Sequence, residues 1–266
     1  MNAIAGSHIR SAKDAPISSM ADWFAHAPPK GLKLHWQDGR SAKETARAWI
    51  DALPAMPSEI EDVLKAHPDF GPVLDWRAQP EARLEFDSLR GEPRNTDLLV
   101  HARDATGQYI VAVEAKADES FGETVAKALE AASKAVIKTP NSQRRRRIDW
   151  LLAHVLPCNV PRPSVQNTSA DLALRYQLLT ACAGAVAQAS RENCKRAVML
   201  VQELVSTTKT TPENLQRNAQ DLEDFVCRLA GVQLAGQSGT LIGPFTTKVA
   251  PEVALYVGKV RRELDA

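Results

Sequence analysis

Apolar residues in the first part of the chain recur every three or four positions. They do so over residues 41–53 and again over 58–67, and Pro68 ends the second run. Each run opens on a Ser-x-x-Glu capping box, at Ser41 and at Ser58. The pattern predicts two short amphipathic helices. No such pattern precedes them, so residues 1–30 are expected to form a flexible N-terminal segment.

The pattern then changes from helical spacing to alternation. Residues 82–87 alternate between apolar and polar side chains, and residues 97–101 and 108–116 have the composition of strands. Turn residues lie at 91–95, and the segment 104–107 contains the glycine of a hairpin connection. Three consecutive strands joined by short turns predict an antiparallel meander.

Helical spacing returns beyond a third capping box at Ser120, and further helices are predicted over 144–155, 169–190 and 211–229. Ser169 is expected to cap the second of these, after a proline-containing loop over 157–169. Residues 196–201 are continuously apolar, which is typical of a strand buried on both faces, and 253–260 read as a last strand. A buried strand needs a sheet to join. The sequence therefore predicts an α/β (α+β) fold with a mixed central sheet, in one domain over 31–266.

Composition and charge exclude several classes of protein. Lys and Arg number 33 and Asp and Glu 32, so a polybasic coat is ruled out and any nucleic-acid contact needs a local basic patch. The four cysteines lack metal-site spacing and predict reduced thiols in the cytoplasm. Neither an apolar signal region nor a run of about 18 apolar residues is present, which predicts a soluble protein without membrane contact.

Candidate chemistry lies on the predicted meander. Alternation along 108–116 places Glu114 and Lys116 on one face at the end of an apolar strand, and Asp97 begins the neighbouring strand. Two carboxylates on adjacent strands bind a hard divalent cation such as Mg²⁺ or Mn²⁺ through oxygen. A lysine beside them can orient a water and offset charge on a reacting phosphodiester.

Asp97 with Glu114-Ala115-Lys116, in this order of helices and strands, resembles the PD-(D/E)xK nuclease superfamily, which has a restriction-endonuclease-like αβα sandwich fold. Residues 113–122 and 39–46 look like an uncharacterised bacterial family assigned to it. The resemblance covers residues 33–137 and implies an Mg²⁺- or Mn²⁺-dependent endonuclease acting on DNA. It implies that Asp97, Glu114 and the carbonyl of Ala115 bind the metal and that Lys116 positions the attacking water. It also leaves open a homodimer, as in many members of this superfamily.

The sequence leaves three matters open. Members of the superfamily often add a further acid, and the candidates for it here are Glu59, Glu61, Glu81 and Glu85. Arg144, Arg145, Arg146 and Arg147 form a basic run that either contacts nucleic acid or simply begins an exposed helix. Glu114 and Lys116 can also be a plain ion pair, in a nucleic-acid-binding or protein-interaction module without catalysis. Asp118 and Glu119 are interpreted as a solvated turn.

Overall fold

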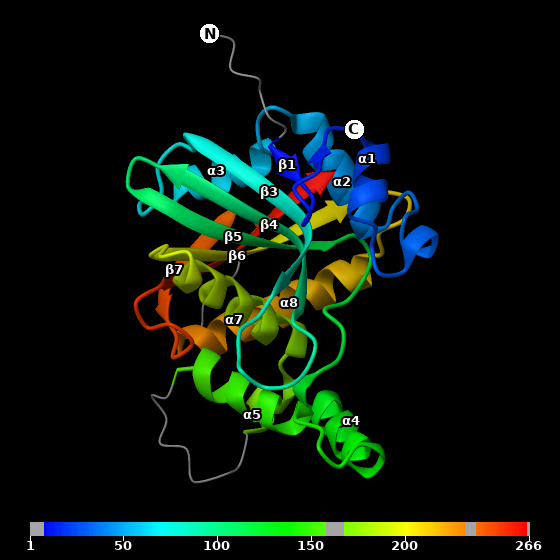
Figure 1. The fold of residues 1–266 in the computed structure, drawn as a ribbon, viewed down its shortest axis with the longest axis vertical. Coiled ribbons are helices and arrows are strands. Elements are labelled where there is room, and N and C mark those ends of the chain that lie inside the picture. The colour runs from blue at the N-terminus through cyan, green and yellow to red at the C-terminus, as the bar shows by residue number, and fades with distance from the viewer. Residues whose placement is uncertain (1–7, 158–167, 232–237, 265–266) are drawn as a thin grey trace.

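The centre of the molecule is an eight-stranded mixed sheet, seen edge-on in the computed structural model of Figure 1, which describes residues 8–157, 168–231 and 238–264. The spatial order is β2-β1-β3-β4-β5-β6-β8-β7. β3, β4 and β5 form the predicted antiparallel meander, and β5, β6 and β8 run parallel. The strands are β1 (Ile9–Arg10), β2 (Pro16–Ile17), β3 (Asp75–Leu84), β4 (Arg94–Asp104), β5 (Gly107–Lys116), β6 (Arg196–Val205), β7 (Thr240–Thr246) and β8 (Ala254–Glu263).

Helices cover both faces of this sheet, which confirms the expected α/β class (Figure 1). One face packs against the N-terminal helices in a core that includes Trp49 and Tyr109, and the other packs against the later helices. The N-terminal group is α1 (Met20–His26), η1 (Leu32–Leu34), α2 (Ser41–Ala52) and α3 (Ser58–Ala66). The later group is α4 (Val125–Lys138), α5 (Arg144–Val155), α6 (Ser169–Ala173), α7 (Tyr176–Arg191) and α8 (Pro212–Ala230).

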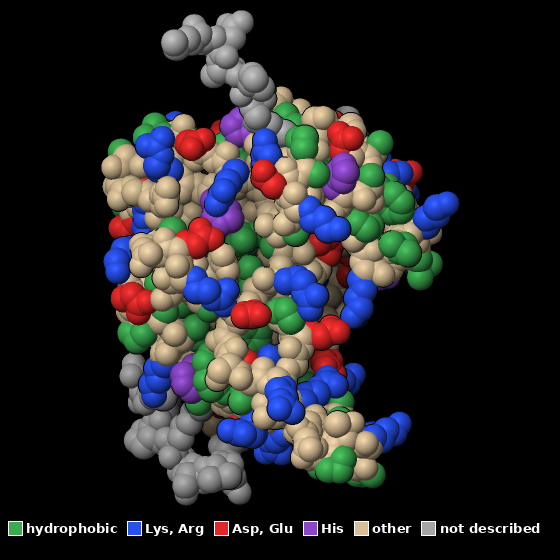
Figure 2. Space-filling model, in the orientation of Figure 1, with side chains coloured by type: hydrophobic (Ala, Val, Ile, Leu, Met, Phe, Trp, Pro, Cys, Tyr) green, Lys and Arg blue, Asp and Glu red, His purple; other side chains and the backbone are tan. Residues whose placement is uncertain are grey.

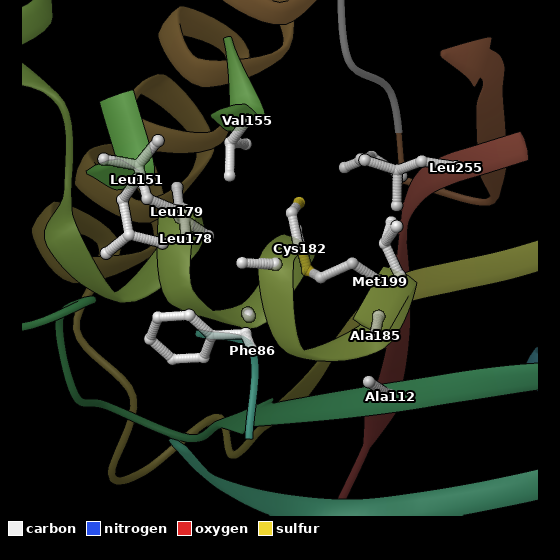
Figure 3. Packing of buried hydrophobic residues seen from close by; sticks show 14 of the residues in the cluster. Phe86, Ala112, Leu151, Val155, Leu178, Leu179, Cys182, Ala185, Met199 and Leu255 are labelled. Carbon is white, nitrogen blue, oxygen red and sulfur yellow. The ribbon is translucent and has the colours of Figure 1, made fainter. Parts of the chain in front are cut away.

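Helix α7 is the centre of the second core. Its small and apolar residues are buried along most of its length, so the helix lies close to the sheet. Figure 3 shows Cys182 and Ala185 of α7 beside Met199 of β6. This packing fixes the N-terminal end of α7, which carries Tyr176 and Gln177, at one end of the sheet.

The serine capping boxes were wrong in detail. The Oγ atoms of Ser41 and Ser58 do not cap their helices, because each serine is already the first helical residue. Helix α4 begins five residues after Ser120 and is capped by Thr124. The predicted 169–190 helix is two helices, and the first is capped by Thr168, one residue before Ser169. The helical pattern fixes the face of each helix, whereas the cap depends on the local backbone.

Three other expectations differ from the structure. Part of the segment expected to be flexible, residues 1–30, is ordered: β1, β2 and α1 lie there, and Ile9 pairs with Ala78 of β3. The first meander strand was predicted at 82–87 but runs from Asp75 to Leu84. The strand β7 was not foreseen. Most of the proline-containing loop lies outside the described residues.

A buried ion pair ties the β4–β5 hairpin to β6. The Asp104 carboxylate is fully buried and accepts hydrogen bonds from both terminal nitrogens of Arg196, each at 2.8 Å. It also accepts the backbone N–H groups of Gly71, Thr106 and Gly107. Burial alone would raise the pKa of Asp104, but these donors outweigh it and hold the pKa well below its usual range.

Asp104→Asn is therefore expected to lower the free energy of unfolding by about 3 kcal/mol at pH 7, because it leaves Arg196 buried without its counter-ion. The stabilisation is present above the ordinary carboxyl pKa of about 4 and is lost as the pH falls. Urea unfolding at pH 7 and at about pH 2, well below the ordinary carboxyl pKa, measures both effects, with the exposed Asp75→Asn as control. Equal effects of the two substitutions would contradict this account.

Candidate active site

The candidate site lies where β4 and β5 separate. Their ladder runs from the Asp104–Gly107 pair to the Leu98–Val113 pair. Beyond it, side chains replace the backbone bonds: Thr96 Oγ1 donates to the Val113 carbonyl at 3.2 Å, and the Ala115 N–H donates to Asp97 Oδ2 at 2.7 Å. Asp97 thus lies opposite Glu114, as the sequence predicts.

Glu114 is the most strongly bound side chain of the site. It is 2% exposed, and its Oε1 accepts a hydrogen bond from Lys116 Nζ at 2.7 Å. Arg94 and Gln177 also donate to its carboxylate. Burial alone would raise the pKa of Glu114, but the charges of Arg94 and Lys116 outweigh it and lower the pKa. The predicted ion pair of Glu114 and Lys116 is present, within a larger cluster.

Asp97 has the opposite character. Burial, followed by the nearby charge of Glu114, raises its pKa to about 7, against the opposing effects of Lys116 and the Ala115 N–H. The half-buried Asp97 carboxylate and the buried Glu114 carboxylate, of like charge, therefore lie close together. This arrangement favours a bound cation, because a positive charge between them would remove the repulsion.

Among the four candidate acids, the structure places Glu81 at the site. Glu81 lies on β3 between the Pro80–Leu98 and Ala82–Thr96 pairs, opposite Asp97, and contacts the side chain of Asn95. Its φ of 51° turns the strand there, and burial raises its pKa. The other three are elsewhere: Glu59 is bound by Arg262 and Gln202, Glu61 is on α3 of the opposite face, and Glu85 is exposed beyond β3.

These side chains open into a pocket of about 330 Å³. One wall of the pocket comes from β3, β4 and β5, through Glu81, Asp97, Glu114, Ala115 and Lys116. Another comes from the chain that leads into α2, through Lys30, His35, Arg40 and Ser41. Glu119, interpreted from sequence as a solvated turn, also lines it. Its carboxylate accepts the N–H of Ala117 at 2.9 Å and the Oγ of Ser41 at 3.2 Å, and so ties α2 to the end of β5.

Sequence reasoning missed Arg94 and Gln177, and it interpreted Glu119 as part of a solvated turn although Glu119 lines the pocket. Gln177 is far from the meander in sequence, and only the packing of α7 brings it to Glu114. Arg94 precedes the predicted strand 97–101, and no pattern in the sequence distinguishes it from an ordinary surface arginine. Only Glu119 had a usable signal, because it lies three residues after a functional strand end.

The four arginines of the basic run, residues 144–147, differ in their burial. Arg147 donates to the buried carboxylate of Asp87 at 2.8 Å, so it is part of the fold. Arg144 pairs with Glu123 and Arg145 with Asp149, but both remain about half exposed, as does the start of the helix around Arg146. Three arginines of the basic run, Arg144, Arg145 and Arg146, are therefore exposed on α5.

The donor set fits a hard divalent cation. Among residues 8–157, 168–231 and 238–264, no three His, Cys, Asp or Glu side chains are grouped as metal ligands. Mg²⁺, however, is commonly held by one or two carboxylates and completes its shell with water and phosphate oxygen. Asp97, Glu114 and the Ala115 carbonyl offer oxygen only, and burial, followed by the charge of Glu114, raises the pKa of Asp97.

The sequence profile of one family, described as a domain of unknown function (DUF6946), matches residues 16–264. The chain belongs to the DUF6946 family. The match runs from β2 to β8 and so contains every residue of the pocket described above. No curated protein and no solved structure matches this DUF6946 chain. Within its described part, none of the helices is both long and apolar enough to cross a membrane.

The raised pKa of Asp97 predicts how the free energy of unfolding depends on pH. Because its folded-state pKa is raised, ionised Asp97 destabilises the fold as the pH rises through about 7. Below the ordinary pKa of about 4, the carboxyl is neutral in both folded and unfolded chains. Asp97→Asn should therefore raise the free energy of unfolding by about 2 kcal/mol at pH 8 and change it little at pH 4.

Urea unfolding in metal-free buffer at pH 4, 6 and 8 measures this. Asp51→Asn, on the exposed face of α2, is the matched control and should have no pH-dependent effect. A destabilising effect of Asp97→Asn at pH 8 would contradict this account, because it would show that the ionised Asp97 carboxylate stabilises the fold.

Proposed function

We propose that this DUF6946 protein hydrolyses phosphodiester bonds in nucleic acid with the help of Mg²⁺ or Mn²⁺, and that DNA is its preferred substrate. The observation that carries the proposal is one pocket that brings together Asp97, Glu114, the Ala115 carbonyl and Lys116. The four groups come from two adjacent strands, and their arrangement is the one that the resemblance to PD-(D/E)xK nucleases implies.

Each side chain has a role in this proposal. Asp97, Glu114 and the Ala115 carbonyl hold the cation, which when bound polarises the phosphodiester and lowers the pKa of a bound water. Lys116 orients the attacking water and stabilises the negative charge that develops on the phosphoryl oxygens. The water gives up a proton to solvent as its oxygen forms the new bond to phosphorus, the bond to the leaving oxygen breaks, and that oxygen takes up a proton from solvent.

Arg94 fits a supporting role at the phosphate. Its guanidinium contacts Glu114, and its Nε is buried without a hydrogen-bond partner among the residues that the structure describes. A guanidinium can bind a phosphate through two parallel hydrogen bonds. If Glu114 binds a cation, its carboxylate no longer accepts the hydrogen bond from Arg94. A substrate phosphate beside Glu114 would then accept that hydrogen bond instead.

The surface supports access by a charged polymer. Figure 2 shows a recess on the right of the molecule, with acidic side chains inside it and Lys and Arg side chains above and below. Lys30 of the N-terminal segment lies 3.8 Å from Glu92 of the β3–β4 loop, and both are largely exposed. Local basic rims of this kind bind a phosphate backbone even when the net charge of the protein is near zero.

A second candidate function is a nucleic-acid-binding or protein-interaction module without catalysis. It is favoured by one observation, the full engagement of the Glu114 carboxylate by Lys116, Arg94 and Gln177. In this alternative the cluster is a buried ionic network that fixes α7 to the sheet. Cleavage separates the two functions.

Cleavage of DNA is expected with Mg²⁺ or Mn²⁺ and not with EDTA, in an assay on supercoiled plasmid and single-stranded DNA with RNA for comparison. Lys116→Ala and Asp97→Asn should each lower the rate by about 100-fold or more, because each removes a group that acts on the transition state. Lys134→Ala, on the exposed face of α4, should retain full activity. Activity that survives in both site variants would place the chemistry elsewhere, and no cleavage of any substrate would favour the second candidate.

The exposed arginines predict a separate effect on binding. The double substitution Arg145→Glu and Arg146→Glu should weaken DNA binding about tenfold and flatten its dependence on salt concentration, because phosphate contacts are lost. Fluorescence anisotropy at several salt concentrations measures both. The double substitution Arg191→Glu and Lys195→Glu, at exposed positions at the other end of α7 from the pocket, is the charge-matched control. Unchanged binding in the double variant would exclude α5 from the nucleic-acid interface.

A further inference from the structure

A second pocket adjoins the candidate active site. It has a volume of about 530 Å³ and shares Asn95, Lys116 and Gln177 with the first pocket. The two pockets are therefore neighbouring parts of one cleft, with Lys116 on the border between them. A volume of this size is within the range that holds small organic groups.

The charged side chains around this second pocket are already paired. Arg147 binds the buried Asp87, Arg94 and Lys116 bind Glu114, and Glu123 binds Arg144. Arg94 and Lys116 serve the phosphate over the first pocket in the proposed function, and the other ion pairs leave no cation for a second phosphate. The pocket suits a group that is uncharged, flat and polar at its edge.

One aromatic side chain supplies a flat surface. Phe86, Phe121 and Tyr176 line the pocket, and of these Phe86 and Phe121 are buried whereas Tyr176 is partly exposed. Phe86 is held firmly, since it stacks on Trp150 with 6.0 Å between ring centroids and lies under the Arg147 guanidinium at 5.2 Å. Tyr176 is half-buried at the first turn of α7, where its backbone N–H donates to the Glu123 carbonyl at 3.1 Å. The backbone at Tyr176 is therefore held in place before any ligand arrives.

We infer that this second pocket receives one unpaired nucleobase of the strand whose phosphodiester lies over Asp97, Glu114 and Lys116. The inference rests on the proposed function and names its substrate class: a single strand, or a strand with a base turned out of the duplex. Stacking on a protein aromatic ring holds a base of any sequence, and a base in an intact duplex stack cannot enter such a pocket. Tyr176 is the residue that the base contacts.

The test uses a short single-stranded oligodeoxynucleotide with one 2-aminopurine, whose emission falls when it stacks on an aromatic ring. Ca²⁺ replaces Mg²⁺ to slow cleavage. The wild type and Tyr176→Phe should both quench the emission, because both keep the ring. Tyr176→Ala should abolish the quenching and weaken binding about tenfold. The same sequence as an intact duplex should bind more weakly and show no quenching.

Ser120→Leu provides a second variant that leaves the aromatic wall in place. Ser120 is a half-exposed loop residue at the pocket, so leucine there should narrow the pocket and lower the quenching. Thermal unfolding followed by circular dichroism checks that each variant is folded. Quenching that stays at the wild-type level in both Tyr176→Ala and Ser120→Leu, or that is as strong with the duplex, would overturn the inference.

The results for the pocket and for hydrolysis can be told apart. Metal-dependent cleavage without Tyr176-dependent quenching would keep the proposed function and overturn the base pocket. Tyr176-dependent quenching without cleavage would support the base pocket and contradict hydrolysis. If no strand binds, both proposals fail.

Discussion

The site is organised by the burial of one negative charge. Glu114 lies at the end of a central strand with 2% of its surface exposed, where an unpaired carboxylate would be very unfavourable. Three separate elements meet there to satisfy it: Lys116 from its own strand, Arg94 from β4 and Gln177 from α7. The cluster therefore fixes the N-terminal end of α7 against the sheet. It also places the two pockets on either side of Lys116.

The central part of the site could be predicted because it depends on local periodicity. Alternation along β5 puts Glu114 and Lys116 on one face, and the short hairpin brings Asp97 opposite Glu114. The partners of that trio could not be predicted in the same way. Gln177 reaches Glu114 across 63 positions of sequence, and its place depends on how the small residues of α7 pack against the sheet.

The same distinction explains the errors in the fold. The amphipathic patterns correctly locate α2, α3 and α5, because a helix face is a property of the segment itself. The N-terminal residues show no such pattern, yet Ile9 is fully buried where β1 adds to the edge of the sheet beside β3. Two-residue strands are too short to have a period. Their order comes from the sheet edge that they cover, which a single sequence does not display.

The balance of charge at the site argues for a ligand. A purely structural network is expected to match its acids with bases, as Asp104 is matched with Arg196. At the candidate site, Arg94 and Lys116 are both directed to Glu114, and Asp97 and Glu81 are left with raised pKa values beside it. Their extra negative charge does not stabilise the fold. Acids of this kind are useful when a cation binds between them, because the cation then replaces the protons that otherwise neutralise them.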